Sequence, residues 1–153
     1  MALDDATDRV RDMLERIADA AGVDTDVEIQ VENGELVAEY VGDDLGLLIG
    51  RHGQTIDAIQ HLAYRIASPG DGDRVSVVVD AAGYRERRAE VLRRTGDQAA
   101  ESAVASGRPV PLQAMSALER KVIHEHLKGR RGIETYSEGQ EPSRHLVIAP
   151  TVS

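Results

Sequence analysis

Two glycines, Gly50 and Gly53, enclose Arg51 and His52 directly before an amphipathic segment that starts near Gln54. Because glycine lacks a Cβ atom, each of the two permits a tight turn and lets the backbone of a ligand approach. The helix that follows would direct the partial positive charge of its N-terminus at an anion. The pattern favours a loop that binds a phosphodiester backbone, although a GxxG sequence taken alone is more often a structural turn.

The residues before this loop predict one helix and one hairpin. Hydrophobic periodicity indicates a helix over residues 5–21, ended by Gly22. Two alternating segments follow, separated by Asn33-Gly34, the dipeptide that favours a type I′ turn. A two-residue turn fixes the register, so one face of the hairpin should carry the pairs Val27 with Tyr40, Ile29 with Ala38 and Val31 with Leu36.

The segments on either side of the glycine loop complete an α-β-β-α-α-β order. Residues 45–49 predict a short turn of helix before the loop, and residues 74–80 predict a third, largely buried strand. The helix after the loop carries an apolar stripe of Ile56, Ile59, Ala63 and Ile66. This order indicates the fold class α/β, more closely α+β.

The second half of the chain predicts a long helix, a shorter helix and two strands, at residues 83–106, 116–127, 133–136 and 144–148. Gly96-Asp97 could break the long helix, since glycine inside a helix costs about 1 kcal/mol. Residues 107–111 form either a connector or a short edge strand. Ser116 and Glu119 have the spacing of a capping box at the start of the shorter helix.

Charge divides the chain into unlike halves. The formal net charge of −9 argues against a uniformly basic surface for nucleic acid. Residues 1–80 contain 18 acidic and 6 basic residues, net −12, whereas residues 81–153 contain 9 and 12, net +3. Any nucleic-acid surface must therefore be local. With 4 Tyr and neither Phe nor Trp, an aromatic stacking platform is disfavoured.

The sequence also restricts the compartment and the chemistry. It contains no cysteine, which excludes disulfides, thiolate metal sites and a cysteine nucleophile. Its acidic N-terminus lacks the apolar core of a signal peptide, and no apolar run reaches the length of a membrane span. We therefore expect a cytoplasmic protein without membrane insertion.

The loop and its context resemble a known nucleic-acid-binding domain. The segment Ile49-Gly50-Arg51-His52-Gly53-Gln54-Thr55-Ile56, inside the α-β-β-α-α-β order, closely resembles the type II KH domain. In that family the GxxG loop clamps about four nucleotides of a single strand. The resemblance implies an RNA-binding site at the loop, with a basic residue between the glycines.

A second resemblance covers the remaining residues. Glu119 to His124, together with Glu134 to Gly139 and Arg144 to Ile148, resembles an R-three-H domain, named for an Arg and a His separated by three residues. The tandem is similar to the bacterial Jag (SpoIIIJ-associated, KhpB-like) family. It implies a KH domain over residues 1–81 and an R-three-H domain with its leading helix over residues 82–153. We expect the extra N-terminal domain of longer members to be missing.

Arg120 and His124 are the candidate contacts of the second domain. Four residues apart, they share one helix face and could grip one phosphate or sugar. The alternatives are a solvated face, or a His124 that ties its helix to the C-terminal strands. Arg144 and His145 point to opposite sides of a strand, so only one can join this site, and we expect Arg144. The predicted RNA-binding residues are Gly50, Arg51, His52, Gly53, Gln54, Arg120, His124 and Arg144.

The other motifs give less information about function. A basic cluster in the linking helix could extend a phosphate track or be a solvated face, since Glu86 and Glu90 lie among its members Arg85, Arg87, Arg88, Arg93 and Arg94. The two histidines of His124-Glu125-His126 diverge by roughly 200° on a helix and cannot share a metal. No nucleophile or nucleotide-binding motif occurs. We expect no enzyme activity, no metal and no cofactor.

These features together predict a non-catalytic protein that binds single-stranded RNA, with single-stranded DNA as a possible competitor. The resemblance implies a small stand-alone KH protein as partner and a role in post-transcriptional regulation linked to cell growth and division. The alternative is a scaffold that dimerises through its KH module with little RNA contact. Acid around the loop in three dimensions would favour the scaffold. We expect Gly53→Asp, alone or with Gly50→Asp, to remove most single-strand affinity while the fold stays intact.

Overall fold

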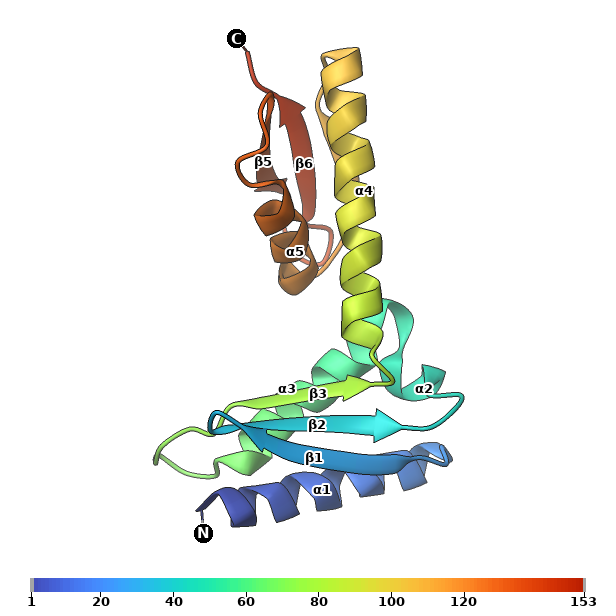
Figure 1. The fold of residues 1–153 in the computed structure, drawn as a ribbon, viewed down its shortest axis with the longest axis vertical. Coiled ribbons are helices and arrows are strands. Elements are labelled where there is room, and N and C mark those ends of the chain that lie inside the picture. The colour runs from blue at the N-terminus through green and yellow to red at the C-terminus, as the bar shows by residue number, and fades with distance from the viewer. Residues whose placement is uncertain (1, 153) are drawn as a thin grey trace. The chain divides into compact units, whose positions relative to one another are not determined.

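The computed structural model describes residues 2–152, which form two compact α+β units. The first unit extends to Arg85 and the second begins at Glu86. Each unit contains one three-stranded sheet with helices packed on it (Figure 1). The fold class predicted from the sequence is confirmed, whereas the domain boundary after residue 81 stays a prediction.

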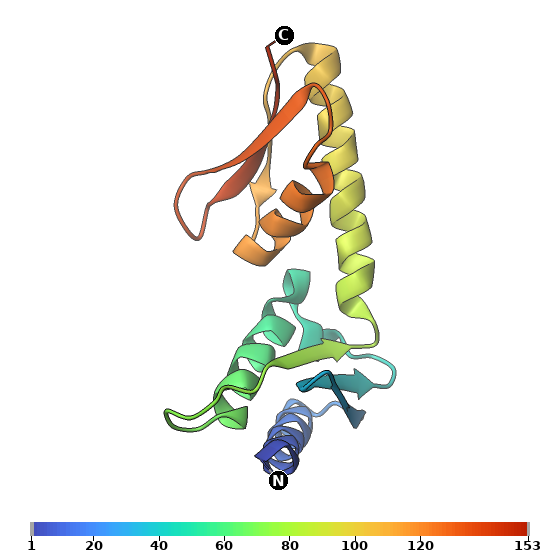
Figure 2. The same ribbon diagram turned by 60° about the vertical axis from the view of Figure 1, so that its left-hand side comes forward.

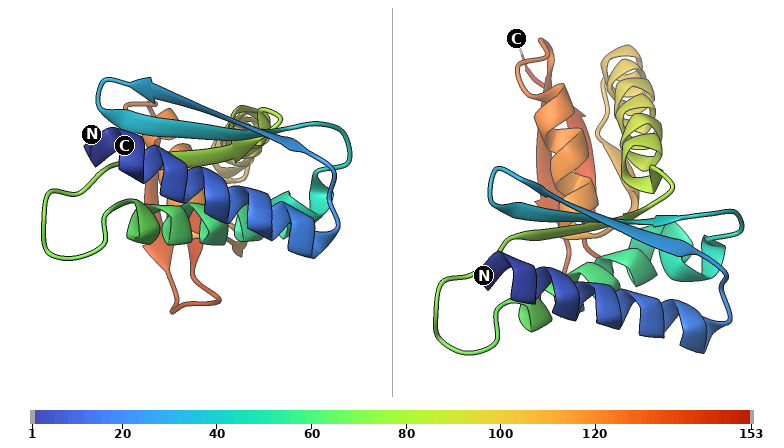
Figure 3. Two further views of the ribbon diagram at one scale, coloured as in Figure 1. Left: turned by 90° about the horizontal axis from the view of Figure 1, so that it is seen from below. Right: turned by 60° about the horizontal axis from the view of Figure 1, so that its bottom comes forward.

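The first unit has the predicted α-β-β-α-α-β order. Its elements are α1 (Ala2–Ala21), β1 (Asp26–Glu32), β2 (Glu35–Val41), α2 (Gly46–Ile49), the 3₁₀ turn η1 (Arg51–Gly53), α3 (Gln54–Ala67) and β3 (Val77–Ala81). In the sheet, β2 lies between an antiparallel β1 and a parallel β3. Helices α1 and α3 lie side by side on one face of this sheet (Figure 3). The core fills the space between helices and sheet.

The hairpin forms in the predicted register. Val27 pairs with Tyr40, Ile29 with Ala38 and Val31 with Leu36. Asn33 and Gly34 have φ values of 52° and 80°, as a type I′ turn requires. The phenol of Tyr40 is fully buried and donates a 2.7 Å hydrogen bond to the carbonyl of Leu14 on α1. The hairpin is thus joined to the first helix through the core.

The third strand is shorter than predicted, because its first residues bond to the end of α3 instead of the sheet. The amide of Val75 donates to Ser68 Oγ at 2.6 Å, and Arg74 Nη1 donates to the Ser68 carbonyl at 3.1 Å. Strand pairing begins only at Val77. The predicted apolar stripe of α3 is confirmed except at its end, where Ala67 is the buried residue in place of Ile66.

The second unit is built on a sheet of three antiparallel strands in the order β4-β6-β5. Its elements are α4 (Tyr84–Ser106, beginning in the first unit), β4 (Val110–Ala114), α5 (Ala117–Leu127), β5 (Ile133–Glu138) and β6 (His145–Pro150). Figure 2 shows α4 and α5 beside this sheet, and their buried residues share one core with β6. The two predicted C-terminal strands are confirmed, and the short edge strand that was one of two alternatives for residues 107–111 forms three residues later, at Val110–Ala114.

The possible break at Gly96 is not observed, because this glycine allows two helices to approach closely. Helix α4 is continuous, and Gly96 is buried inside it. A Cβ atom on Gly96 would lie 2.9 Å from Ile123 Cγ2 and 3.4 Å from Leu127 Cδ1 of α5. The cost of a glycine in the helix is therefore offset by the packing of α5.

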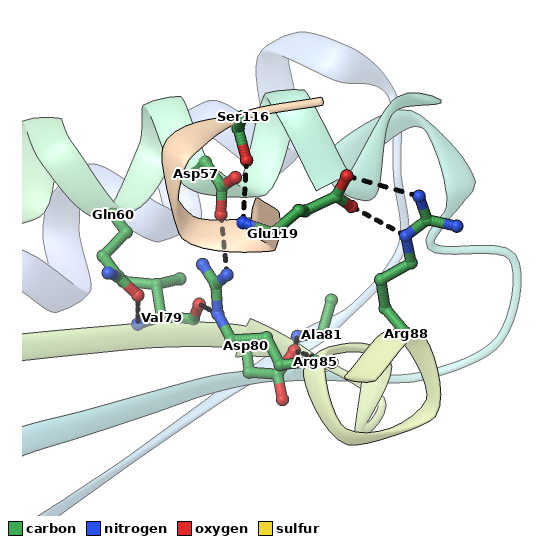
Figure 4. A network of polar contacts seen from close by, with 9 residues as sticks. All are labelled: Asp57, Gln60, Val79, Asp80, Ala81, Arg85, Arg88, Ser116 and Glu119. Carbon is green, nitrogen blue, oxygen red and sulfur yellow. Dashed lines mark hydrogen bonds and ion pairs between the residues drawn. The ribbon is translucent and has the colours of Figure 1, made fainter. Parts of the chain in front are cut away.

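Only half of the predicted capping box forms. Ser116 Oγ accepts a 3.2 Å hydrogen bond from the amide of Glu119, as a cap requires. The Glu119 carboxylate does not bond back to Ser116 and instead pairs with Arg88 on α4 (Figure 4). Among residues 2–152, none of the helices has the length and hydrophobicity that a membrane span requires.

Candidate nucleic-acid interface

The glycine loop is a sharp turn between α2 and α3 in which three of four residues have positive φ. These are Gly50 at 73°, His52 at 55° and Gly53 at 78°. The Gly50 amide ends α2 by donating to the Gly46 carbonyl at 2.8 Å, and the Gly53 amide donates to the Gly50 carbonyl at 3.3 Å. The left-handed conformation of Gly53 then leads directly into the first residue of α3.

Both glycines are required by the protein's own packing. A Cβ atom on Gly50 would lie 2.8 Å from Thr55 Cβ and closer still to the Thr55 hydroxyl. A Cβ atom on Gly53 would lie 2.7 Å from Cε1 of the Tyr84 ring. Real Cβ atoms do not approach other atoms so closely, so Gly53→Asp must displace the Tyr84 ring and should lower stability as well as RNA affinity. The glycines shape the loop, and the side chains between them are the ones free to meet a ligand.

Arg51, His52 and Gln54 are the side chains that the loop presents to solvent. All three are exposed, and none makes a side-chain hydrogen bond or ion pair within residues 2–152. Their donors stand at the N-terminus of the 14-residue helix α3, which carries partial positive charge. The loop therefore offers unpaired donors and a helix end to the same anion.

Carboxylates do lie near the loop, but the one in the first turn of α3 is paired with an arginine. Asp57, in the first turn of α3, accepts an ion pair from Arg85 Nη1 at 2.6 Å. On the other flank, before α2, a hollow of about 590 Å³ is lined by four aspartates, namely Asp24, Asp26, Asp43 and Asp44. The three-dimensional placement of acid consequently leaves the α3 side of the loop open to a polyanion and makes the α2 side unfavourable.

A second hollow, of about 330 Å³, lies between α5 and the strands β5 and β6. Its lining includes the three predicted residues of the second half together with a further cation and two hydroxyls, namely Arg120, His124, Arg144, Lys121, Thr135 and Ser137. The i, i+4 spacing on α5 and the alternation of β6 thus bring the predicted side chains to one place. His145 lies apart from them, 3.7 Å from Glu138 on β5.

Arg120 does not lie on a solvated face, which was one of the alternatives for this pair. It is 8% exposed, and its Nη1 donates to the Met115 carbonyl at 2.7 Å. Its Nη2 forms a 3.0 Å ion pair with Glu141. The buried guanidinium, held at two points, supports the start of α5 and the β5–β6 connection. It lines the hollow and contributes positive charge there although it is hardly exposed to solvent.

His124 ties α5 to the C-terminal strands, which is one of the alternatives that the sequence left open. Its side chain is exposed, and its Nδ1 atom shares a hydrogen bond with Thr135 Oγ1 of β5. That bond joins α5 to the strand and leaves Nε2 as the ring nitrogen able to contact a ligand. Arg144 is half-buried and anchors one nitrogen by donating to the Gly139 carbonyl at 2.6 Å.

Comparison with known proteins gives the family. The family model "KhpA/KhpB, KH domain" matches residues 7–79, and the R-three-H domain model matches residues 90–150. An RNA-binding protein KhpB from Clostridium symbiosum is 35% identical over 144 residues, which are 93% of this chain and 65% of that protein. This chain belongs to the KhpB (Jag) family. It is a tandem of a KH domain and an R-three-H domain.

Two further KhpB relatives match nearly as large a share of this chain. The RNA-binding protein KhpB of Lactiplantibacillus plantarum is 37% identical over 138 residues, covering 90% of this chain and 43% of the relative. That of Bacillus subtilis is 34% identical over 138 residues, covering 89% and 66%. The chain thus spans less than two thirds of the length of these curated KhpB proteins.

Some residues of the R-three-H hollow were missed by the sequence reasoning. Lys121 is exposed and lines the hollow, and its spacing of three from His124 was a usable signal. Thr135 had no such signal, because its bond to His124 depends on how β5 packs against α5. Ser137 repeats the two-residue period of Thr135 along the same strand face.

The arginine cluster of α4 is used mainly for ion pairs within the protein. Arg85 binds Asp57 in the KH domain, Arg88 binds Glu119, and Arg93 binds Glu86 at 2.7 Å. Arg94 is exposed and makes no such bond within residues 2–152. These pairs favour a structural role over a continuous phosphate track. Within the same residues no group of three or more His, Cys, Asp or Glu is placed to hold a metal ion.

Proposed function

We propose that this chain binds single-stranded RNA and that the KH loop is its main contact. The observation that carries the proposal is the pair Arg51 and His52, exposed and unpaired at the start of α3. A phosphate placed there would gain charge-assisted hydrogen bonds and the favourable field of the helix end. The KhpB relatives described above are named RNA-binding proteins, which supports RNA as the polyanion. The proposed function involves binding without catalysis.

The R-three-H hollow would supply a second contact. Lys121 and His124 are exposed there, and Arg144 and the buried Arg120 add positive charge around the same hollow. The hydroxyls of Thr135 and Ser137 could bond to a ribose or a phosphate. With one contact in each domain, the overall affinity would exceed that of either domain alone.

The wider role follows from the family resemblance. We propose that the chain acts in the cytoplasm, in post-transcriptional regulation linked to cell growth and division. A small stand-alone KH protein is the proposed partner, with self-association as an alternative. These assignments extend the RNA-binding proposal and depend on it.

A scaffold is the second candidate, and one observation favours it. The hollow before α2 combines four aspartates with Leu47, whose side chain is 70% exposed. Such a surface repels RNA and would suit a protein partner with basic and apolar side chains. A protein that binds a partner through this surface and does not bind RNA through its glycine loop would be a scaffold with vestigial RNA contact.

Substitution of Arg51 and His52 tests the proposal. The double variant Arg51→Gln with His52→Asn removes the loop's donors, and Asn tolerates the positive φ of position 52. The matched control is Arg65→Gln with His61→Gln, which removes an exposed Arg and an exposed His from the second half of α3. Titration with a short fluorescent single-stranded RNA should show about tenfold weaker binding for the loop variant, the effect of losing two charge-assisted contacts, and little change for the control.

The outcomes separate the candidates. Equal affinities of the two double variants would refute the loop assignment, since only overall charge would then matter. Failure of the unmodified chain to bind RNA, combined with dimerisation or binding to a stand-alone KH protein, would favour the scaffold. Single-stranded DNA and duplex RNA titrated in parallel show whether the site selects single strands and the 2′-hydroxyl.

A further inference from the structure

We propose that Arg85 is a positioning residue for the glycine loop, because it neutralises Asp57 and so keeps the start of α3 attractive to an RNA phosphate. The inference rests on the proposed RNA-binding function and deepens it. Arg85 is the last residue of the first unit, at the beginning of α4, and lies 32 residues beyond Gly53 in the sequence.

The guanidinium of Arg85 is fixed between α3 and β3. Its Nη1 lies 2.6 Å from Asp57 Oδ1, and its Nε donates to the Val79 carbonyl at 2.9 Å (Figure 4). Its own amide donates to Asp80 Oδ1 at 3.2 Å, so the backbone of Arg85 is held as well. With the two side chains 27% and 29% exposed, the ion pair is partly shielded from water. The shielding makes screening by salt incomplete.

Asp57 is the acid that a phosphate at the loop would meet first along α3. It is the fourth residue after Gly53, about 6 Å along the helix axis at 1.5 Å per residue. An unpaired carboxylate at this distance would oppose a phosphate and would also offset the positive helix end. The ion pair with Arg85 removes that opposition while leaving the carboxylate in place.

Two other observations connect this corner to the loop. The ring of Tyr84, the neighbour of Arg85, lies 2.7 Å from the position that a Cβ atom of Gly53 would take, so successive residues contact the loop and α3. The Nη2 atom of Arg85 is buried and makes no hydrogen bond. A buried donor without a partner is costly for stability alone. The cost is understandable if the residue is kept for its charge beside Asp57.

A purely structural role makes a different prediction from charge neutralisation. If Arg85 only joined α3 to β3, its loss would loosen the loop whatever residue stood at position 57. If it neutralises Asp57, removing the carboxylate should make the cation unnecessary. The pair of positions therefore supports a double-mutant cycle with RNA affinity as the readout.

The experiment compares Arg85→Met, Asp57→Asn and the double variant in the full chain, using a fluorescent single-stranded RNA at an ionic strength of about 0.1 M. Arg85→Met should bind about five- to tenfold more weakly, since one uncompensated charge acts at short range. Asp57→Asn should bind as tightly as the unmodified chain or more tightly. The double variant should return to within about twofold of the unmodified chain, and the defect of Arg85→Met should shrink as salt is raised.

A matched control is available on α1. Arg16 and Asp12 form a 3.0 Å pair with exposed side chains. Arg16→Met and Asp12→Asn change the net charge by the same amounts away from the loop. Neither should alter RNA affinity by more than about twofold, because exposed charges beyond a Debye length are largely screened.

Failure of the inference can be told from failure of the proposed function. A double variant that binds as weakly as Arg85→Met would show that Arg85 acts structurally and would overturn the proposal. If circular dichroism shows Arg85→Met to be unfolded, the RNA affinities of Arg85→Lys and Asp57→Asn test the inference instead. Both should then retain affinity, and a loss in either would overturn the proposal. RNA binding that is indifferent to Arg51→Gln with His52→Asn would instead refute the loop as the binding site.

Discussion

Arg88 holds the carboxylate of Glu119 at two points, with Nε 2.7 Å from Oε1 and Nη2 3.3 Å from Oε2. The two side chains are 22% and 10% exposed, so the pair lies largely out of water. Two-point pairing of this kind fixes geometry as well as charge. It fastens α5, which carries Arg120 and His124, to α4 within the R-three-H domain.

Removal of either member should destabilise the R-three-H domain. Glu119→Ala removes the carboxylate that Arg88 holds at two points in a largely shielded place, so we expect a loss of about 2–4 kcal/mol in the free energy of unfolding. Urea unfolding followed by circular dichroism measures it. The control is Arg93→Met, whose partner Glu86 is 74% exposed and which should cost less than about 1 kcal/mol. Equal losses in the two variants would contradict the importance of burial.

Glycine substitutions in the loop should lower stability as well as RNA affinity. Gly53→Ala places a Cβ atom 2.7 Å from the Tyr84 ring at a φ of 78°, so we expect a cost of about 2–4 kcal/mol from overpacking and backbone strain together. Gly70→Ala is the control, because its φ is 94° but no atom lies within 4 Å of the added Cβ. Gly70→Ala should lose only the strain part, about 1 kcal/mol. Thermal unfolding of the two variants would disprove the packing argument if their losses were alike.

Local rules predicted those parts of the fold in which neighbours along the chain decide. The Asn33-Gly34 turn fixed the hairpin register, and Ser116 marked the start of α5. Local rules failed where a distant residue competes. The Glu119 carboxylate bonds to Arg88 instead of completing the capping box. Gly96 remains inside a continuous helix, where its missing side chain makes room for Ile123 of α5.

The candidate site divides in the same way. Arg51 and His52 are exposed as the glycine spacing predicted, since the turn itself points them outward. The burial of Arg120 could not be predicted, because it depends on the Met115 carbonyl and on Glu141 beyond β5. The periodicity of apolar residues along α5 does not indicate either partner. Spacing predicted which side chains come together, and tertiary contacts decide which of them are free.

Arg120 and His124 should separate into a residue needed for stability and a residue needed for binding. Arg120→Ala removes a buried side chain with two partners, so we expect a loss of about 2–3 kcal/mol in unfolding free energy. His124→Ala should cost no more than about 1 kcal/mol, because the side chain is exposed and loses one hydrogen bond. His124→Ala should nevertheless weaken RNA binding several-fold. Melting curves and RNA titrations on the same samples check both, and unchanged affinity in His124→Ala would assign the residue to the scaffold.

The buried phenol of Tyr40 predicts a loss of stability at high pH. Burial raises the pKa of Tyr40 above its ordinary value of 10.0, since the phenolate would be desolvated. The resulting stability is fully present below pH 10 and is lost as the pH rises above it, because the unfolded chain ionises first. The slope should approach about 1.4 kcal/mol per pH unit. Tyr40→Phe should abolish this part of the slope, and an identical pH profile in both proteins would contradict the assignment.

The salt dependence of RNA binding should show how many phosphates each domain contacts. On single strands, each phosphate contact contributes about −0.7 to the slope of log affinity against log salt. A fragment of residues 1–89 keeps Tyr84 and Arg85 beside the loop, whereas a fragment of residues 1–80 lacks both. We expect the 1–89 fragment to bind RNA more weakly and with a shallower slope than the full chain, and the 1–80 fragment to bind more weakly still. Equal slopes for the full chain and the 1–89 fragment would show that the R-three-H hollow makes no phosphate contact.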